Sequence, residues 1–443
     1  MPSRSPVPSR TPSYATVLRT RHAARTFGAA LLGRLSYGMV SLSLMLAVNA
    51  ATGSYSVAGA VMALYGATSV FLSPARAALI DRHGPRRVLP PLAGVYAVLL
   101  GALAYATWRP GAPAFLLGAL AAAAGAGTPP LGPVMRTLWS GLVADRELLR
   151  RAYSLDGVAE ELLFVSGPLL VGVVVKFAPP AAGIVVSAAL ILVGTLALVS
   201  SPAVRGRGAG VAPSDDKAAG PEDPPVGRRL LGIVGLRHAV LVTAAVGLCL
   251  GGLDLLVVAF AEQRHQGAGA VSWVLAALSA GSAVGGLAYG AVSWRASNRA
   301  RLPLLAAGLG VAVVAAGLSP GVYVLAALAA VAGLFVAPAL TTAYLIADES
   351  VGAGSRTQAG AWVNTAVNAG SSVGAAAAGL LVDRLPPAVC FAVAAVPALL
   401  CAAVVARGAV ARGAAAREAV DSGPVESGDA DGGETARGAV SRS

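Results

Sequence analysis

Long apolar runs, separated by short polar segments that carry arginine, are the dominant pattern of this chain. Two runs, 35–75 and 302–347, contain no charged residue. Each is long enough for two helices of about 20 residues, the length that crosses a hydrocarbon core. A turn-forming tripeptide lies near the middle of each run, Thr52-Gly53-Ser54 in the first and Ser319-Pro320-Gly321 in the second. Both runs are therefore predicted to be membrane-spanning helical hairpins.

Dividing the double runs at their turns predicts twelve spans in two groups of six. The spans of the first group are 27–49, 56–80, 88–108, 112–138, 154–176 and 181–200. Those of the second group are 238–260, 271–294, 302–318, 322–347, 357–382 and 388–406. The predicted fold is an all-α integral membrane protein with two six-helix bundles, 27–200 and 238–407. The N-terminal tail (1–26), the linker (201–237) and the C-terminal tail (408–443) are polar, and the linker and the last tail are predicted to be disordered.

Composition agrees with this class. Of the 443 residues, 56% are hydrophobic and only 12% are charged, and the mean hydropathy is +0.72. A soluble globular domain of ordinary composition has about twice that charged fraction. The chain is therefore predicted to be a multi-pass membrane protein.

The placement of basic residues predicts the orientation. Arginine and lysine near span ends are retained on the cytoplasmic side. If the N-terminus lies inside, nearly all basic residues fall on inner segments; the exceptions are Arg109, Lys176, Arg264 and Arg384 outside and Arg34 within a span. Both termini are therefore predicted to be cytoplasmic, in the plasma membrane. The net charge of +12 then reflects topology and contact with anionic lipid, and no nucleic-acid partner is predicted. The polar N-terminus and the full-length first run predict no cleaved signal peptide.

Enzyme and metal chemistry find little support in the sequence. The four histidines, His22, His83, His238 and His265, have no second histidine at metal-ligand spacing and no acid poised beside them. A phosphate-binding glycine loop with Lys-Ser/Thr is absent from the sequence, which argues against ATP as the energy source. The three cysteines fall within predicted spans and are interpreted as packing residues. No enzyme activity, metal or cofactor is predicted.

The two halves share traces of a parallel repeat. An offset of 208 superposes Asp156 on Asn364 and Glu160 on Asn368, and aligns a glycine and a proline of the fourth and tenth spans, Gly125 with Gly333 and Pro130 with Pro338. A second offset, of 213, places Asp81 and Arg82 over Trp294 and Arg295.

A loop between the second and third spans carries a family resemblance. The stretch "ARAALIDRHGPRRVL" (75–89) resembles the loop signature of the major facilitator superfamily; the matching residues are Asp81, Arg82, Gly84, Arg86 and Arg87, while Ala77 replaces the usual glycine. The resemblance implies that the loop stabilises one access state through charge pairs and a helix end of the opposite half. Arg136 is the predicted partner of Asp81. The alternative interpretation is that the loop arginines only fix topology.

A second stretch resembles the superfamily's proton-driven exporters. "SGPLLVG" (166–172) is similar to a shortened Gly-Pro motif of their fifth helix, and Gly167 and Pro168 match it. Leu163 and Ser154 occupy the places of its upstream glycines, and the exporters' fourth-helix arginine motif is not evident in 112–131.

Three carboxylates, Asp156, Glu160 and Glu161, lie in the inner part of the fifth span. With a start near Ser154, Glu160 is about 9 Å into the membrane. A charge there costs about 2 to 3 kcal/mol unless it is paired or hydrated. Arg34 of the first span lies at a matching depth, so we hypothesise that it pairs with Glu160 or Glu161.

The roles of these acids have two interpretations. Asp156 is predicted to lie in the first turn of its helix, stabilised by the helix dipole. Glu160 and Glu161 form either a proton-coupling site or a structural ion-pair network. Asp254 in the seventh span is a candidate proton or substrate-cation site, or it reaches the outer water.

Prolines and amides within spans predict a cavity or hinges. Pro130 lies in the fourth span and Pro338 in the tenth. Each proline leaves a backbone carbonyl without its helical donor, and a neighbouring helix or a wet cavity must satisfy that carbonyl. Simple packing kinks are the alternative. Gly167 and Pro168 form a candidate hinge, and Asn364 and Asn368 either line the cavity or join helices.

The function predicted from these features is secondary active transport. The preferred form is a monomeric, bacterial, proton-coupled antiporter that exports a small organic molecule, a drug or metabolite, by alternating access. The proton gradient is the expected energy source. The alternatives are an importer of a small solute, and a sensor or scaffold of the same fold that does not transport.

Overall fold

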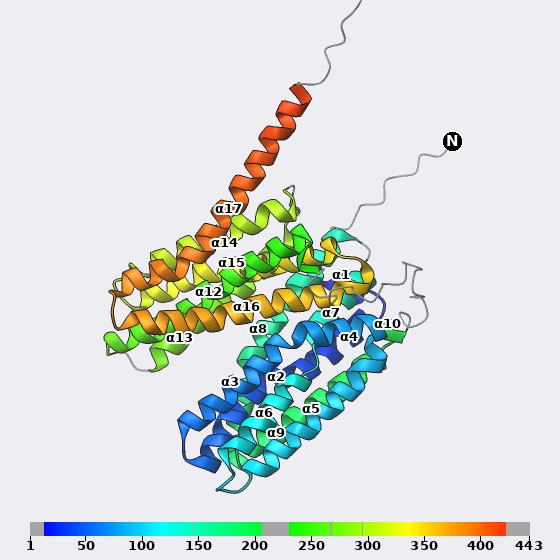
Figure 1. The fold of residues 1–443 in the computed structure, drawn as a ribbon, viewed down its shortest axis with the longest axis vertical. Coiled ribbons are helices and arrows are strands. Elements are labelled where there is room, and N and C mark those ends of the chain that lie inside the picture. Colours follow the sequence, from blue (N-terminus) through cyan, green and yellow to red (C-terminus); the bar gives the residue numbers. More distant parts are fainter. Residues whose placement is uncertain (1–12, 144, 206–229, 266–267, 295, 422–443) are drawn as a thin grey trace, which may run out of the picture.

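The structure, a computed structural model, describes residues 13–143, 145–205, 230–265, 268–294 and 296–421, and their regular structure is helical. Two bundles lie side by side (Figure 1). The first contains α2 (Ala23–Thr52), α3 (Tyr55–Phe71), α4 (Ser73–His83), α5 (Pro85–Thr107), α6 (Ala114–Gly127), α7 (Leu131–Leu142), α8 (Arg146–Phe177) and α9 (Ala181–Val199). The second contains α12 (Val234–Gln263), α13 (Ala268–Ala291), α14 (Asn298–Ala316), α15 (Val322–Ser350), α16 (Arg356–Val382) and α17 (Pro387–Asp421). The short elements are α1 (Tyr14–Arg19), α10 (Pro202–Arg205) and η2 (Ala353–Ser355).

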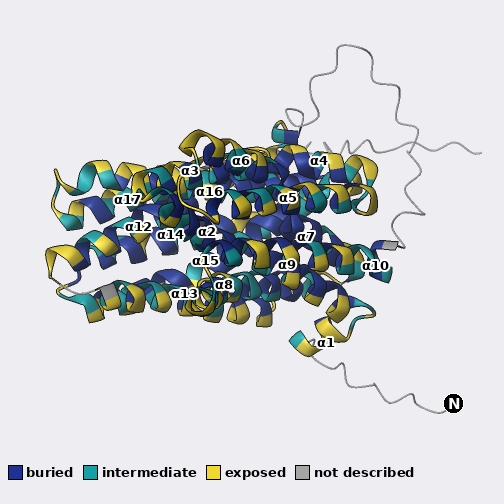
Figure 2. Ribbon diagram, turned by 90° about the horizontal axis from the view of Figure 1, so that it is seen from below, coloured by how far each residue is buried: buried dark blue, intermediate teal, exposed yellow. Residues whose placement is uncertain are grey.

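The prediction of twelve spans in an all-α fold is confirmed. The described residues contain 12 helical segments long and apolar enough to cross a membrane, where α3 with α4 and α6 with α7 each make one span. Large apolar side chains cover the outside of the bundles; Phe115 is 86% exposed and Tyr323 is 89% exposed. Figure 2 shows buried positions facing the bundle interiors and exposed positions on the outer surface. Such an apolar exterior suits contact with lipid.

Several helices extend beyond the predicted boundaries. α8 begins at Arg146 instead of 154, because Asp145 caps it by accepting the Leu148 N–H at 2.9 Å. The C-terminal tail, predicted to be disordered from 408, is helical to Asp421. Its sequence there contains six alanines, two arginines and one glutamate, all of which are strong helix formers. Linker residues 206–229 and tail residues 422–443 lie outside the described part of the chain.

Glycines bring the helices of each bundle into backbone contact. A Cβ atom added to Gly167 of α8 would lie 2.4 Å from the carbonyl carbon of Gly38 on α2. In the second bundle, a Cβ on Gly251 of α12 would lie 1.9 Å from the Ser371 carbonyl oxygen on α16. These two helix pairs occupy equivalent places in the two halves. The candidate hinge residue Gly167 therefore lies at a tight α2–α8 packing contact.

A valine at position 167 is expected to destabilise the first bundle. The added atoms would overlap the α2 backbone, and overpacking of this kind costs about 1 to 3 kcal/mol. The midpoint of thermal unfolding in detergent should therefore fall for Gly167→Val. Gly172→Val is the matched control on the same helix, since a Cβ at Gly172 meets nothing within 4 Å. Equal midpoints for the two variants would contradict this account of the α2–α8 contact.

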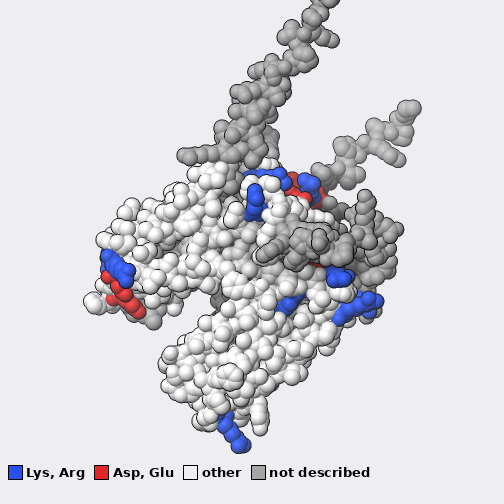
Figure 3. Space-filling view, viewed as in Figure 1, with Lys and Arg blue, Asp and Glu red and all other residues white. Residues whose placement is uncertain are grey.

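The two bundles meet mainly at one end. We call this the basic end; it carries the α4–α5 loop with Arg86 and Arg87, the start of α8 and the start of α14. Away from it, the space-filling view is hollowed between the two bundles (Figure 3). The hydrogen bonds between described residues of α2–α9 and α12–α17 lie toward the basic end, and those from Ser282 to Glu161 and from Thr365 to Val70 are among the deepest. The molecule is therefore closed at its basic end and open at the other.

Candidate functional site

Four charged side chains meet inside the first bundle, and we call them the ion cluster. Arg34 of α2 contacts Asp156 at 2.8 Å (Nη1 to Oδ1) and Glu160 at 3.0 Å (Nη2 to Oε2). Arg136 of α7 contacts the same two carboxylates, at 3.1 Å (Nε to Asp156 Oδ2) and 2.5 Å (Nη2 to Glu160 Oε2). Asp156 and Glu160 can share these partners because residues four apart lie on one helix face. The two positive and two negative charges balance.

The charges of the ion cluster must balance because its side chains are largely buried. Asp156 is fully buried, Arg34 is 2% exposed and Arg136 is 5% exposed, whereas the Glu160 side chain is 30% exposed. Removing one partner of a buried ion pair leaves an uncompensated charge, which is strongly destabilising. The ion cluster therefore has a structural role in the first bundle, and Glu160 is its most accessible member.

Two predictions made from the sequence, the pairing of Arg34 and the position of Asp156, can be compared with the ion cluster. The pairing of Arg34 with a glutamate is confirmed, and the glutamate is Glu160. The placement of Asp156 in the first turn of its helix is wrong. Because α8 begins at Arg146, Asp156 lies well inside the helix, and two guanidinium groups compensate its charge instead of free backbone N–H groups.

The predicted pairing of Arg136 with Asp81 is also wrong. Arg136 points into the bundle toward Asp156 and Glu160. The Asp81 carboxylate instead accepts the backbone N–H groups of Thr357 at 3.3 Å and Gln358 at 2.8 Å, at the start of α16 in the opposite bundle. This contact is with a helix end of the other half, where a negative charge is favoured by the helix dipole.

The second bundle covers the ion cluster with an aromatic ring. The Cζ atom of Arg136 lies 3.8 Å from the centroid of the Tyr344 ring on α15, a cation–π contact. The Tyr344 hydroxyl donates to Asn364 Oδ1 at 3.4 Å. Asn364, the repeat mate of Asp156, is thus linked to the ion cluster through one tyrosine. Its neighbour Asn368 is exposed and donates to the Asn364 carbonyl at 2.7 Å within α16.

Glu161 faces away from the ion cluster and toward the second bundle. Its Oε1 atom accepts a hydrogen bond from the Ser282 hydroxyl of α13 at 3.0 Å. Among the described residues, no arginine, lysine or histidine forms an ion pair with it. Asp254 of α12 is an exposed residue of the second bundle. Glu161 therefore lies where the two bundles meet, with no cationic partner among the described residues.

The fourth span is broken, as its prolines predict. α6 ends at Gly127 and α7 begins at Leu131, with Pro130 at the junction. Arg76 of α4 satisfies two of the freed carbonyls, donating to Gly125 at 2.6 Å and Ala126 at 2.7 Å. The Tyr37 hydroxyl donates to the carbonyl of Pro129.

The role of Arg76 is not predicted from the sequence, in which it is one of the basic residues near the inner end of the second span. Arg76 is only 7% exposed and lies in a helix. The signal that could have found it is its position: it lies inside the predicted second span, five residues before Asp81, while the broken fourth span needs a donor.

The other candidate hinge prolines lie within continuous helices. Pro338 is buried inside α15, and its carbonyl accepts the Thr342 hydroxyl at 2.7 Å. Pro168 is exposed inside α8. α15 and α8 continue through these prolines without a break.

The motif loop lies against the opposite bundle. Gly84 has φ +83° and ψ 149°, a conformation that is essentially restricted to glycine. Nearby, Arg356 of α16 donates to the Ser140 hydroxyl of α7 at 3.1 Å. A cavity of about 900 Å³ lies between these elements, and its walls include Asp81, Arg82, Gly84, Arg86 and Arg87. The loop residues thus surround one gap at the closed end.

One interbundle contact arises from a proline. Pro74 of α4 has no N–H group, which leaves the carbonyl of Val70 without its helical donor. The hydroxyl of Thr365 on α16 donates to that carbonyl at 2.9 Å. The bend between α3 and α4 therefore supplies an acceptor that the second bundle uses in the closed basic end.

No metal site is found in the part of the chain that the structure describes, since no three His, Cys, Asp or Glu side chains are grouped there in a way that could hold an ion. The described cysteines, Cys249, Cys390 and Cys401, are not joined in disulfides. The chemistry that the described site offers is therefore that of carboxylates, guanidinium groups and hydroxyls.

Comparisons with known proteins agree with this architecture. The model of the Major Facilitator Superfamily matches residues 26–315 and 239–429. No curated protein sequence matches the chain. Among solved structures, a bacterial homologue of the iron transporter ferroportin in an outward-facing state has a TM-score of 0.72 at 14% identity, covering 87% of this chain and 99% of its own.

Two further structures are similar over most of their length. The human organic anion transporter MFSD10 (TETRAN) has a TM-score of 0.65 at 19% identity, covering 89% of this chain and 100% of its own. The E. coli fucose:proton symporter FucP has a TM-score of 0.56 at 16% identity, covering 85% and 98%. At these identities the likeness shows the fold.

Proposed function

The chain belongs to the major facilitator superfamily, and from this premise we propose that it is a proton-coupled exporter of small organic cations. Its family and its structural neighbours indicate a secondary transporter rather than an enzyme. The direction of transport, the coupling ion and the substrate class are the proposed part. The single observation that carries them is Glu161, an intramembrane acid that contacts the opposite bundle through Ser282 and pairs with no cationic side chain of the described residues.

The proposed orientation places the basic end in the cytoplasm. Positively charged span ends are retained on that side, and the arginines of the motif loop and of the α8 start lie at this end. The hollow between the bundles then opens to the outside (Figure 3). In this orientation the molecule is in an outward-open state, with its cytoplasmic gate closed by the contacts of Asp81, Thr357 and Gln358.

Glu161 is the proposed carrier of the proton, and Glu160 is not. Protonation of Glu160 would remove its charge from two guanidinium groups that lie 3.0 and 2.5 Å away. Protonation of Glu161 disturbs only a hydrogen bond from a serine hydroxyl, which can be rearranged because a hydroxyl both donates and accepts. The ion cluster therefore keeps its charge balance while Glu161 changes state.

The proposed substrate is a cation because Glu161 has no cationic partner among the described residues. An ionised carboxylate attracts positive charge. A proton or an organic cation can neutralise it, and the two compete for the same charge. A cation that binds from the cytoplasm thus releases a proton there, and a proton that binds from outside expels the cation. This competition is the basis of the proposed antiport.

Transport in inverted membrane vesicles tests the proposal. Ethidium is a suitable probe because it is a fluorescent organic cation, and a neutral phenanthridine of similar size is the matched comparison. We expect an imposed gradient, acid inside, to drive ethidium accumulation, and we expect a protonophore to abolish it. Accumulation only in right-side-out vesicles would indicate an importer, and the absence of any transport would favour a sensor or scaffold. Ethidium transport at the same rate with and without the pH gradient would contradict proton coupling.

A further inference from the structure

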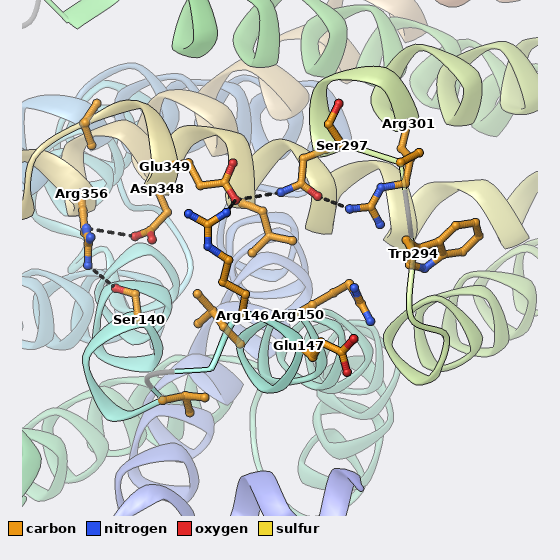
Figure 4. A pocket seen from close by; sticks show the side chains of 16 residues that line it. Ser140, Arg146, Glu147, Arg150, Trp294, Ser297, Arg301, Asp348, Glu349 and Arg356 are labelled. Atoms are coloured by element: carbon orange, nitrogen blue, oxygen red, sulfur yellow. Dashed lines mark hydrogen bonds and ion pairs between the residues drawn. The ribbon is translucent and has the colours of Figure 1, made fainter. Parts of the chain in front are cut away.

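A second cavity lies at the basic end between the two bundles, and Figure 4 shows its side chains. Its volume is about 600 Å³. The walls come from the start of α8, the segment joining α13 to α14, the end of α15 and the start of α16. Four arginines and three carboxylates line this arginine pocket: Arg146, Arg150, Arg301, Arg356, Glu147, Asp348 and Glu349. Positive charge is therefore in excess at a junction of both bundles.

Two of the carboxylates already have partners. Asp348 lies 3.4 Å from the Nε atom of Arg356. Glu349 accepts a hydrogen bond from Asn298 Nδ2 at 3.0 Å and lies 4.0 Å from Arg146 Nη1. Figure 4 shows these contacts as dashed lines on one side of the pocket. The arginines that remain are Arg150 of α8 and Arg301 of α14.

Arg150 and Arg301 are buried, and neither forms an ion pair with another residue in the described part of the chain. They are 6% and 8% exposed, and no carboxylate of the described residues lies within ion-pair distance of either. Arg150 Nη2 donates to the Val292 carbonyl at 2.5 Å, and Arg301 Nη2 donates to Asn298 Oδ1. Among the described residues, the Nε atom of Arg150 and the Nε and Nη1 atoms of Arg301 have no hydrogen-bond acceptor. Buried guanidinium groups with free donors favour an anionic ligand.

The surrounding residues hold Arg301 in place. Its Cζ atom lies 5.3 Å from the Tyr289 ring centroid and 5.6 Å from that of Trp294. Trp294 is fixed in turn, because its Nε1 atom donates to the Tyr289 carbonyl at 3.1 Å. Ser297 and Asn298 at the start of α14 also line the pocket, so the positive end of a 19-residue helix adds to the arginine charge. The donors are therefore arranged before any ligand binds.

The internal repeat explains why this pocket differs from the one at the motif loop. In the first half, Asp81 bonds the start of α16 and so joins the bundles with a negative charge. In the second half, the offset of 213 places Trp294 at the position that Asp81 has in the first half. In the arginine pocket, the residue of the opposite bundle is Arg150 of α8. The second half thus lacks the carboxylate at this position and has cationic groups from both bundles facing one gap.

We propose that the arginine pocket binds a phosphate group that bridges Arg150 and Arg301. A tetrahedral oxyanion has enough oxygens to accept from two guanidinium forks at once. The volume of the pocket also leaves room for an organic part attached to the phosphate. The phosphate belongs either to a soluble molecule or to a lipid headgroup. Because the two arginines lie in different bundles, the bound group stabilises the closed basic end and opposes its opening.

Thermal unfolding of the purified full-length protein tests the proposal, and this test does not depend on transport. The midpoint is measured in a neutral detergent with sodium phosphate and with sodium chloride at equal ionic strength and pH. We expect phosphate to raise the midpoint above its value in chloride. Arg150→Gln and Arg301→Gln should each lose that increment. Arg25→Gln is the matched control and should keep it, because Arg25 is an exposed arginine outside the pocket.

Reconstitution distinguishes the two sources of phosphate. The same variants are placed in phosphatidylcholine vesicles with and without phosphatidylglycerol. A midpoint that rises only with phosphatidylglycerol, and only when Arg150 and Arg301 are present, identifies a lipid headgroup; a rise with free phosphate identifies a soluble ligand. If one glutamine variant does not fold, the other variant decides. The proposal would be overturned if neither phosphate nor phosphatidylglycerol raised the unfolding midpoint of the wild type. It would also be overturned if both glutamine variants showed the same rise as the wild type.

Discussion

Asp156→Asn is expected to lower the free energy of unfolding by about 3 to 5 kcal/mol, the usual loss when one partner of a buried ion pair is removed. Asp156 is fully buried and compensates Arg34 at 2.8 Å and Arg136 at 3.1 Å. With asparagine in its place, two buried guanidinium groups share the single carboxylate of Glu160. The loss should appear as a large fall in the thermal unfolding midpoint in detergent. Asp383→Asn, at an exposed position on the same chain, is the control.

A double variant separates charge balance from side-chain shape. Arg34→Gln combined with Asp156→Asn removes one positive and one negative charge, and leaves Arg136 paired with Glu160. The double variant should therefore be more stable than the Asp156→Asn single variant, as coupling within one network requires. If Asp156→Asn is no less stable than Asp383→Asn, the ion cluster does not hold the first bundle together.

Glu161→Gln is expected to abolish gradient-driven transport while the protein stays folded. Glutamine keeps the shape of the side chain, and its amide oxygen can still accept the hydrogen bond from Ser282. It cannot bind and release a proton. In vesicles, the variant should therefore lose ethidium accumulation driven by a pH gradient, down to the level of vesicles without the protein.

Ser282→Ala is the matched control for that variant. It removes the hydrogen bond across the bundles but keeps the Glu161 carboxylate. Accumulation in this variant should be slower and should still require the pH gradient. If Glu161→Gln accumulates ethidium as the wild type does, then Glu161 does not carry the proton.

The fold could be predicted because lipid imposes a strong constraint on sequence. Apolar runs such as 302–347 must be helical, since backbone groups within the membrane have no water to bond. The depth of a charge in its span was also informative. The rise along two helices that enter from the same side predicts that Arg34 pairs with Glu160 or Glu161, and in the structure Arg34 contacts Glu160 at 3.0 Å.

The errors have physical causes. Hydropathy marks where a helix enters lipid, not where it begins, so the extension of α8 back to Arg146 could not be read from apolar residues. The position of Asp156 within its helix was wrong for this reason. Arg136 was misassigned because its position at the inner end of the fourth span gives its depth but not the direction of its side chain, which points toward Asp156 and Glu160. Arg76 was missed because its role depends on carbonyls of another span.

The central claim is that Glu161 exchanges a proton for an organic cation, and proton release on binding tests it most directly. Purified protein in a weakly buffered solution with a pH-sensitive dye is mixed with ethidium, and binding is followed separately by ethidium fluorescence. The wild type should release protons as ethidium binds, whereas Glu161→Gln should bind ethidium without that release. Equal proton release from the two proteins at equal ethidium binding would contradict the account.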